Sequence, residues 1–225
     1  MNELHPGFTR NLGPLDEAAL RRLDGVTAAV VGCGGLGGYV ADFLARAGVG
    51  RLRLIDGDRF EPSNLNRQLF ARQDTLGRPK ASAGKAHIEA LGLGTRVTAF
   101  DSFLTGDNAE ALLRGCDIVM DALDRVAPRL ILEQSCTALE IPIIHGAVGE
   151  WSGQAAVVLP GSGFYRKLYT GGEPRRGGVL APTVSLVASL EVLLALRLLT
   201  GQPVNAGELL YFDALSPDIL HLPLS

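Results

Sequence analysis

Residues 26–56 read VTAAVVGCGGLGGYVADFLARAGVGRLRLID, and this stretch predicts the fold. Its first part, Val26–Val31, is an apolar run rich in β-branched residues, which is typical of a buried strand. A glycine-rich turn follows, and Leu36–Ala47 then carries apolar residues at helical spacing until another glycine stops the helix. Arg51–Ile55 alternates between polar and apolar residues, so the stretch predicts a strand–helix–strand unit of about 30 residues.

The alternation of helices and strands continues downstream of this unit. We expect helices at Pro79–Leu91, Asn108–Arg114 and Val126–Leu139, and strands at Arg96–Phe100, Asp117–Met120 and Ile141–Ile144. Strands that alternate with helices form parallel sheets covered on both faces, because each crossover helix packs on the sheet. The predicted fold class is therefore α/β, with a Rossmann-like, doubly wound and mostly parallel sheet.

After His145 the pattern changes. The remaining segments are a strand at Gln154–Leu159, a loop at Pro160–Ala181, a helix at Thr183–Leu199 and strands near Glu208–Phe212 and Ile219–Leu222. The connections between the late strands are too short for crossovers, so we expect antiparallel strands that extend the sheet at its C-terminal end. The loop of about 20 residues is long for a compact domain, which indicates a functional or disordered segment.

Composition and charge limit the possible partners. The 225 residues are 47% hydrophobic and 20% charged, which favours a single globular domain over residues 1–225, with an N-terminal arm at 1–25. The net charge of −3 gives no overall positive field, so we expect no nucleic-acid partner. Glu191 and Arg197 interrupt the apolar helix at 183–199, which favours a buried or subunit-interface helix over a membrane span. The N-terminus has no apolar signal core, and the three cysteines form no C-x-x-C pair, so a cytoplasmic location is expected.

The turn GCGGLG at residues 32–37 has the spacing G-x-G-x-x-G between a strand and a helix. Glycines at Gly32, Gly34 and Gly35 would let phosphates approach the amides of a helix N-terminus, where the helix dipole favours negative charge. Asp56 ends the second strand, where an acid can accept hydrogen bonds from ribose hydroxyls. The pattern predicts an adenine-nucleotide site; the structural alternative is that the glycines serve only close packing.

Polar residues beyond Asp56 favour a triphosphate over a dinucleotide. Two cations, Arg67 and Lys80, could bind and stabilise the extra charge of a triphosphate during displacement. The alternative is that both are solvated surface cations. The other nucleotide-binding candidates of this region are Asp58, Ser63, Asn64 and Asn66.

Two carboxylates follow the fourth predicted strand, at the sheet edge where such folds bind ligands. Asp124 is the candidate Mg²⁺ ligand, since Mg²⁺ usually takes one or two carboxylates together with phosphates and water. Two roles stay open for Asp121. It could belong to the site, or it could be structural, as a cap of the next helix or a hydrogen-bond acceptor for the loop.

The motifs GCGGLG, ARAGVGRLRLIDGD, SNLNRQ, GRPK, DALD and GVLAP together resemble the ThiF, MoeB and HesA family, the bacterial relatives of ubiquitin-activating enzymes. The resemblance covers Arg10 to Phe212. It implies an adenylation domain whose segment 160–181 is a crossover loop. The implied reaction is ATP-dependent adenylation of the C-terminal Gly carboxylate of a ubiquitin-like sulfur carrier ending in Gly-Gly, with release of pyrophosphate.

The resemblance also implies residue roles. Gly35 and Asp56 correspond to nucleotide contacts, and Asp124 to the Mg²⁺ ligand. The segment 63–67 and Lys80 correspond to the phosphate-binding residues. Arg10 corresponds to an arginine that reaches the partner subunit's ATP site, which implies a homodimer with shared sites. The implied catalytic set is Arg67, Lys80, Asp124 and Arg10.

This sequence departs from the family at three points. Relatives often hold zinc through two C-x-x-C pairs, but residues 164–167 read FYRK here, so no structural zinc is expected. The segment 160–181 contains no cysteine, and Cys33, Cys116 and Cys136 are expected to be buried and inert. Arg125 stands where relatives often have Asn, at a candidate nucleotide contact.

Three other functions stay open at this point. One is a tRNA-modifying relative that activates the carboxylate of threonylcarbamoyladenosine, which would need a basic RNA-binding surface. The second is a non-catalytic nucleotide-binding partner subunit, although such a protein would not need to retain Arg10, Arg67, Lys80 and Asp124. The third is an NAD-dependent oxidoreductase, which would bind NAD rather than ATP. His145 is interpreted as a hydrogen-bonded structural histidine.

Overall fold

The computed structural model describes residues 4–172, 177–216 and 219–224. They form one eight-stranded sheet in the order β3-β2-β1-β4-β5-β6-β7-β8. The strands are β1 Thr27–Val31, β2 Arg51–Ile55, β3 Arg96–Phe100, β4 Ile118–Asp121, β5 Ile143–Gly149, β6 Ser152–Val158, β7 Glu208–Asp213 and β8 Ile219–Pro223. The helices are α1 Glu17–Gly25, α2 Gly35–Ala47, α3 Lys80–Ala90, α4 Ala109–Leu113, α5 Val126–Ala138, α6 Phe164–Leu168 and α7 Ala181–Leu199, with short 3₁₀ helices at Pro6–Asn11, Pro62–Asn64 and Gln73–Thr75.

The first five strands are parallel, as predicted. Strand β1 lies at the point where the order reverses, because the chain passes from β1 to β2 on one side and later returns to β4 on the other. In open α/β sheets, ligands bind outside the carboxyl ends of the strands at such a switch point. The topology therefore places the candidate site at the ends of β1, β2 and β4.

The last three strands extend the sheet in antiparallel fashion, which confirms the predicted fold class. Strand β5 runs to Gly149, five residues beyond the predicted end at Ile144. The extension arises because β5 and β6 form a hairpin that pairs Ile143 with Val158 at one end and Gly149 with Ser152 at the other.

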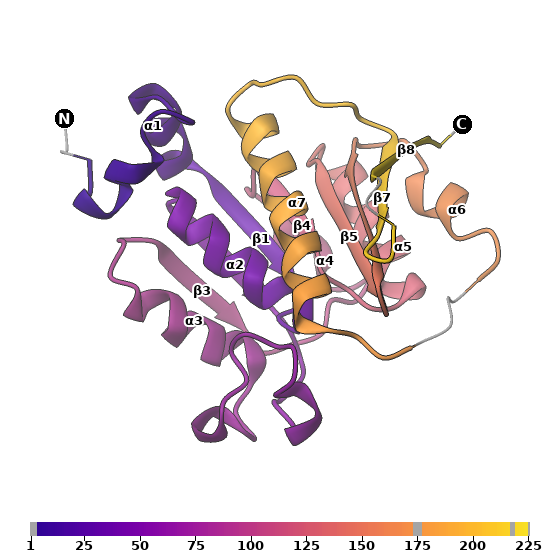
Figure 1. Cartoon of the computed structure of the whole chain (residues 1–225), viewed down its shortest axis with the longest axis horizontal. Coiled ribbons are helices and arrows are strands. Elements are labelled where there is room, and N and C mark those ends of the chain that lie inside the picture. The colour runs from indigo at the N-terminus through magenta and orange to yellow at the C-terminus, as the bar shows by residue number, and fades with distance from the viewer. Residues whose placement is uncertain (1–3, 173–176, 217–218, 225) are drawn as a thin grey trace.

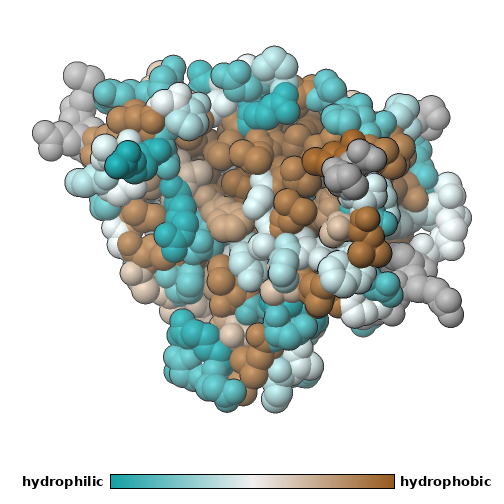
Figure 2. All heavy atoms as spheres, viewed as in Figure 1, coloured by the Kyte–Doolittle hydropathy of each residue, from teal (hydrophilic) through white to brown (hydrophobic). Residues whose placement is uncertain are grey.

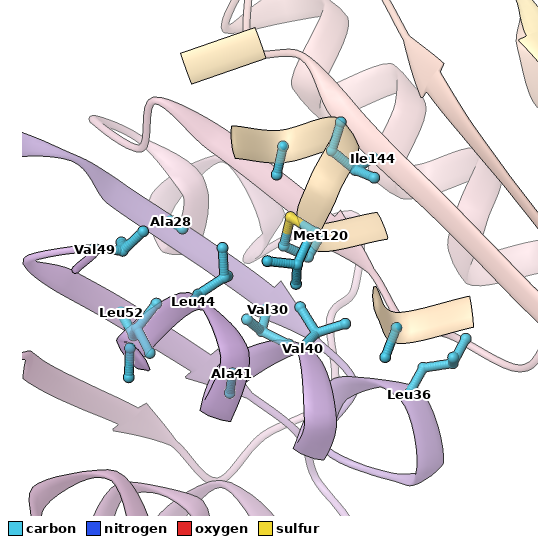
Figure 3. Close-up of a cluster of buried hydrophobic side chains, with 14 of the residues drawn as sticks. Ala28, Val30, Leu36, Val40, Ala41, Leu44, Val49, Leu52, Met120 and Ile144 are labelled. Carbon is cyan, nitrogen blue, oxygen red and sulfur yellow. The ribbon is translucent and has the colours of Figure 1, made fainter. Parts of the chain in front are cut away.

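Helices cover both faces of the sheet (Figure 1). Helices α2, α3 and α7 lie on one face, and α4, α5 and α6 on the other. Between α2 and the sheet, Val30 of β1 and Met120 of β4 pack against Leu44, and all three are fully buried (Figure 3). Since burying one such side chain stabilises a fold by roughly 1.5–3 kcal/mol, this layer holds α2 and its N-terminal turn in place.

The segment 160–181 contains a short helix, so the prediction of a loop is wrong for its first part. Helix α6 forms at Phe164–Leu168, and its residues Phe164 and Tyr165 are buried against the second face of the sheet. A five-residue helix has no measurable sequence periodicity, so tertiary burial determines it. The prediction for residues 173–176 lies outside the described residues.

Helix α7 accounts for the most apolar stretch of the chain. Within the described residues it is the one helix long and apolar enough, by length and composition, to cross a membrane. Its inner side packs on β5, β6 and α2, while Leu186 and Leu193 are exposed on its outer side. Figure 2 shows apolar residues gathered over this helix. Packing on the sheet explains the apolar composition of the inner side of α7.

Glu191 lies on the inner side of α7 and is fully buried. Neither of its carboxyl oxygens has a hydrogen-bond partner within the described ranges. It lies against Gly146 of β5, where any larger side chain would overlap with the carboxyl group. Burial raises the pKa of Glu191 well above 4.5; the charge of Asp121 adds to the shift and that of Arg129 opposes it.

Glu191→Gln is expected to change the pH dependence of folding stability. The unfolded chain loses this proton above a pKa of about 4.5, whereas the folded chain retains it. Glu191 therefore lowers the free energy of unfolding by up to about 1.4 kcal/mol per pH unit between its unfolded and folded pKa values. The advantage of Glu191→Gln over the parent chain should grow as the pH rises above about 4.5 in urea denaturation. A difference that stays constant as the pH rises would contradict this assignment.

Candidate active site

The glycine-rich turn connects β1 to α2, and two of its glycines are required by the turn itself. Gly32 has φ +93°, and a Cβ on it would lie 2.6 Å from the carbonyl oxygen of Ala122. A Cβ on Gly37 would overlap with the carbonyl oxygen of Gly32. These two positions support the packing interpretation of the glycine pattern, although close packing does not exclude a ligand beside them.

Gly34 and Gly35 form the start of α2 and are not crowded in this way. A Cβ on Gly34 would lie 3.5 Å from the Gln68 amide, and one on Gly35 would lie 3.5 Å from Val184. Within the described ranges, no side chain caps the helix at Gly34. The first amides of α2 are therefore available to an anionic ligand, and the helix dipole favours such a ligand.

Gln68 lies beside this helix start, and the sequence interpretation did not single it out. Its side chain is buried, and its Oε1 atom has no hydrogen-bond partner within the described ranges. Buried polar atoms are normally paired, so the amide of Gln68 is suited to contact a bound ligand near Gly34. The oxygen and nitrogen of an amide can exchange places by rotation, so either group can face the ligand.

Asp56 connects the end of β2 to the glycine turn. Its carboxylate accepts hydrogen bonds from the backbone N–H of Cys33 at 2.6 Å and of Asp58 at 2.8 Å. Burial raises the pKa of Asp56, while these bonds and the charge of Lys80 oppose the shift. A carboxylate has about four lone-pair positions, so Asp56 retains acceptor capacity for ribose hydroxyls.

A cavity of about 390 Å³ opens beyond Asp56. It is lined by Gly57, Asp58, Arg59, Glu61, Asn64, Lys80 and Phe103. Lys80 is the first residue of α3 and is almost fully buried, with its Nζ atom 3.3 Å from Asp58 Oδ2. The structure therefore brings Asp58, Asn64 and Lys80 together at one cavity and excludes the alternative that Lys80 is a solvated surface cation.

The segment that contains Asn64, Asn66 and Arg67 is held largely by its own polar groups. Asn64 is buried, and its Oδ1 accepts a hydrogen bond from the N–H of Glu61 at 3.0 Å. Arg67 is half-buried and donates to the Ser63 carbonyl and to Asn66 Oδ1, at 3.0 and 2.8 Å. Asn66 Nδ2 donates to the Val179 carbonyl at 3.2 Å, which links this segment to the residues before α7.

Asp124 and Arg125 are exposed in the loop between β4 and α5. This loop contacts the glycine turn, since the Ala122 N–H donates to the Val31 carbonyl at 3.0 Å and the Ala122 carbonyl lies close to Gly32. Asp124 is therefore placed at the same sheet edge as the start of α2.

Asp121 is not exposed at that edge. Its side chain is fully buried and hydrogen-bonded, so the structure favours the structural role that was left open. We use the name Asp121 cluster for Asp121, Arg129, His145, Tyr165 and Tyr169.

The Asp121 cluster lies behind the β4–α5 loop. Asp121 Oδ2 is 3.0 Å from Arg129 Nε, 2.8 Å from His145 Nδ1 and 2.6 Å from the Tyr165 hydroxyl. Burial alone would raise the pKa of Asp121, but the Arg129 guanidinium and the bonds from His145 and Tyr165 lower it. Burial lowers the pKa of His145, which also contacts the Gln154 amide at 3.1 Å, as expected of a structural histidine.

The sequence interpretation missed Arg129, Tyr165 and Tyr169. Arg129 is buried and donates to the carbonyls of Leu123 and Gly146 and to the Tyr169 hydroxyl. The available sequence signal was an arginine placed eight residues after Asp121, a carboxylate whose role was left open.

Arg10, one of the predicted catalytic residues, lies away from the glycine turn. It lies in the 3₁₀ helix Pro6–Asn11, and Asn11 Nδ2 donates to the Arg46 carbonyl at 2.8 Å, near the C-terminal end of α2. The glycine turn is at the opposite end of that 13-residue helix, about 20 Å away. Arg10 of this chain therefore lies too far away to contact its own glycine turn.

The three thiols are buried and free of disulfides, as expected. Burial raises the pKa of Cys116 to about 11 and of Cys136 to about 12, and the pKa of Cys33 well above 9.0. Because the reactive form of cysteine is the thiolate, the raised pKa values support the prediction that the thiols are inert.

Comparison with known proteins places the chain in a family. It matches the model of the ThiF family over residues 8–225. The chain belongs to the ThiF family. This membership confirms the resemblance found in the motifs of the nucleotide turn, the 63–68 segment and the β4–α5 loop.

Several curated ThiF-family relatives are named adenylyltransferases. The chain is 35% identical over 212 residues to the sulfur carrier protein ThiS adenylyltransferase of Escherichia coli, with 90% of this chain and 84% of the relative covered. It is 36% identical over 219 residues to the sulfur carrier protein adenylyltransferase of Thermus thermophilus, with 91% and 79% covered. It spans 46% of the adenylyltransferase and sulfurtransferase MOCS3 of Anopheles gambiae, at 35% identity over 201 residues and 85% of this chain. The chain is an enzyme of the adenylyltransferase class.

Solved structures share the fold. Selenomethionine PaaA superposes with a TM-score of 0.81 at 24% identity, covering 92% of this chain and 76% of that one. Escherichia coli MccB crystallised with ATP also gives a TM-score of 0.81, at 19% identity, covering 98% of this chain and 72% of that one. At such low identities these likenesses show the fold alone.

The candidate metal ligand set is small. In the described part of the chain, no group of three or more His, Cys, Asp or Glu side chains lies together so as to hold a metal ion. A Mg²⁺ ion bound to a triphosphate takes few protein ligands and completes its shell with phosphate oxygens and water. Asp124, exposed beside the glycine turn, fits this kind of site. That no structural zinc is present stays a prediction.

Proposed function

We propose that this ThiF-family enzyme uses ATP to adenylate the C-terminal Gly carboxylate of a ubiquitin-like sulfur-carrier protein and releases pyrophosphate. One observation carries the proposal: a single sheet edge gathers an uncapped helix start, a buried lysine at a 390 Å³ cavity and an exposed aspartate loop. Anion-binding amides, a cation and a metal-type carboxylate are the groups that a triphosphate requires. The relatives named sulfur carrier protein adenylyltransferases support the choice of substrate.

The proposed chemistry requires charge stabilisation more than proton transfer. A carboxylate is already ionised at neutral pH, so it can attack the α-phosphorus without a protein base. The bond between the α-phosphorus and the oxygen that bridges it to the β-phosphate breaks. Pyrophosphate leaves with the electron pair of that bond. Lys80 and Arg67 bind negative charge on the phosphates, and the first amides of α2 hold the phosphate chain.

The other residues orient the nucleotide. Asp56 accepts hydrogen bonds from the ribose, and Asp58, Ser63, Asn64 and Asn66 shape the pocket beside it. Asp124 would hold Mg²⁺, with Arg125 adjacent; when bound, the ion neutralises phosphate charge. Arg10 lies about 20 Å from its own glycine turn, so a role for it in the ATP site requires a second copy, and we include a homodimer with shared sites in the proposal.

The expected result in an ATP–pyrophosphate exchange assay is carrier-dependent exchange. Purified protein with Mg²⁺, ATP and labelled pyrophosphate is tested against a panel of small carriers ending in Gly-Gly. Exchange with one carrier, and none with the same carrier lacking its last Gly, is the expected outcome. Binding of ATP without exchange for any carrier would contradict the proposed substrate and would favour the threonylcarbamoyladenosine tRNA or a partner-subunit role.

A further inference from the structure

The β4–α5 loop is held from behind at the residue next to Asp124. Asp121 Oδ1 accepts a hydrogen bond from the N–H of Leu123 at 3.1 Å, and Arg129 Nη2 donates to the Leu123 carbonyl. Both backbone polar groups of Leu123 are therefore bound by the charged pair of the Asp121 cluster. The position of Asp124, one residue further along, depends on this pair.

The same charged pair also holds α6. The Tyr165 hydroxyl donates to Asp121 Oδ2 at 2.6 Å, and Arg129 Nη1 donates to the Tyr169 hydroxyl. The Arg129 guanidinium also lies over the Tyr169 ring, 5.4 Å from its centre. One ion pair thus connects the first part of segment 160–181 to the loop that carries Asp124.

Burial makes this connection sensitive to the loss of one partner. The side chains of Asp121 and Arg129 are 0% and 4% exposed, so water does not replace a missing hydrogen bond. Removing one partner from a buried ion-pair network leaves an unsatisfied charge, and the remaining groups must rearrange. The same buried pair therefore joins α6 to the backbone of Leu123, next to Asp124.

We propose that Tyr165 and Tyr169 are positioning residues: by docking α6 on Asp121 and Arg129, they set the β4–α5 loop so that Asp124 can bind the divalent metal of a metal–ATP complex. The inference rests on the metal role of Asp124 in the proposed function. Supporting groups behind a metal ligand commonly change metal affinity by about 10- to 100-fold when they are removed.

The test measures Mn²⁺ binding by electron paramagnetic resonance in the presence of a non-hydrolysable ATP analogue. Tyr165→Phe is expected to raise the Mn²⁺ dissociation constant about 10-fold. It should also speed amide hydrogen exchange of residues 121–125. Tyr169→Phe provides a second variant with the same expected direction. Tyr211→Phe is the matched control, because no hydrogen bond of the Tyr211 hydroxyl is found among residues 4–172, 177–216 and 219–224; it should leave both readouts unchanged.

A double-mutant cycle with Asp124→Asn separates positioning from general destabilisation. If the tyrosines act through Asp124, Tyr165→Phe has no further effect on the Mn²⁺ dissociation constant once Asp124 is replaced. Equal weakening in both backgrounds, or unchanged Mn²⁺ affinity in both tyrosine variants, would overturn the inference. Wild-type Mn²⁺ affinity in Asp124→Asn would overturn it as well. None of these readouts needs a carrier, so failure to adenylate any carrier is a separate result.

Discussion

Lys80→Ala is expected to lower ATP–pyrophosphate exchange by at least ~100-fold while the chain stays folded. Lys80 is the buried cation of the 390 Å³ cavity, and removal of one hydrogen-bond donor to a transition-state charge typically costs about 10²- to 10³-fold in rate. The fold should survive, because its partner Asp58 is 57% exposed and becomes hydrated when the lysine is lost. Exchange rates and thermal melting measured on the same preparation check both parts.

Lys85→Ala is the matched control for Lys80→Ala. Lys85 lies on the same helix, and its side chain is 43% exposed and pairs with Glu89 at the surface. This control should retain the parent exchange rate. A folded Lys80→Ala variant with exchange like that of Lys85→Ala would remove Lys80 from the catalytic set.

The Lys80 variant also tests whether subunits share sites. Arg10→Ala should be inactive alone, but mixed with Lys80→Ala it can form a dimer in which one site has both intact residues. With random pairing, about a quarter of all sites would be restored. If mixing restores no exchange although mixed dimers form, the two residues do not belong to a shared site.

Gly37→Ala is expected to destabilise the fold by more than about 3 kcal/mol, or to prevent folding. The added Cβ would overlap with the carbonyl oxygen of Gly32, a backbone atom that cannot rotate away. Overpacking of a close-packed site costs roughly 1–3 kcal/mol even where side chains can adjust. Urea denaturation or the yield of folded protein measures the effect.

Gly35→Ala is the control on the same helix. A Cβ at Gly35 would meet Val184 at 3.5 Å, an ordinary contact, so this variant should fold. Equal stability of the two variants would mean that the turn is looser than the structure shows. The pair also separates a glycine required by packing from one that is available to the ligand.

The sequence predicted the parallel half of the fold well because that half has strong local signals. β2 and β3 begin and end at the predicted residues, and the glycine turn was expected between β1 and α2. The antiparallel half was less well bounded, since β5 extends through the residues that pair with β6. Helix α6 was missed because five residues carry no period, and only burial of Phe164 and Tyr165 reveals it.

For the site, the sequence predicted the residues near the sheet edge but not their supports. Motif spacing pointed to Asp58, Asn64 and Lys80, which the fold brings to one cavity. Arg129 was not singled out, because a lone Arg on a helix is common at surfaces. Gln68 was quoted only as the last residue of the SNLNRQ motif and received no role of its own. Their significance comes from burial, which depends on contacts between residues far apart in the sequence.

The most direct measurement of the central claim follows the α-phosphate. Protein, Mg²⁺ and ATP labelled at the α-phosphorus are incubated with a Gly-Gly carrier, and the carrier is analysed for label. The account predicts label on the carrier as an acyl-adenylate, with release of unlabelled pyrophosphate, and no label when the last Gly is deleted or when Lys80→Ala replaces the parent chain. Nucleotide binding without label on any carrier would contradict the claim that this enzyme adenylates a carrier carboxylate.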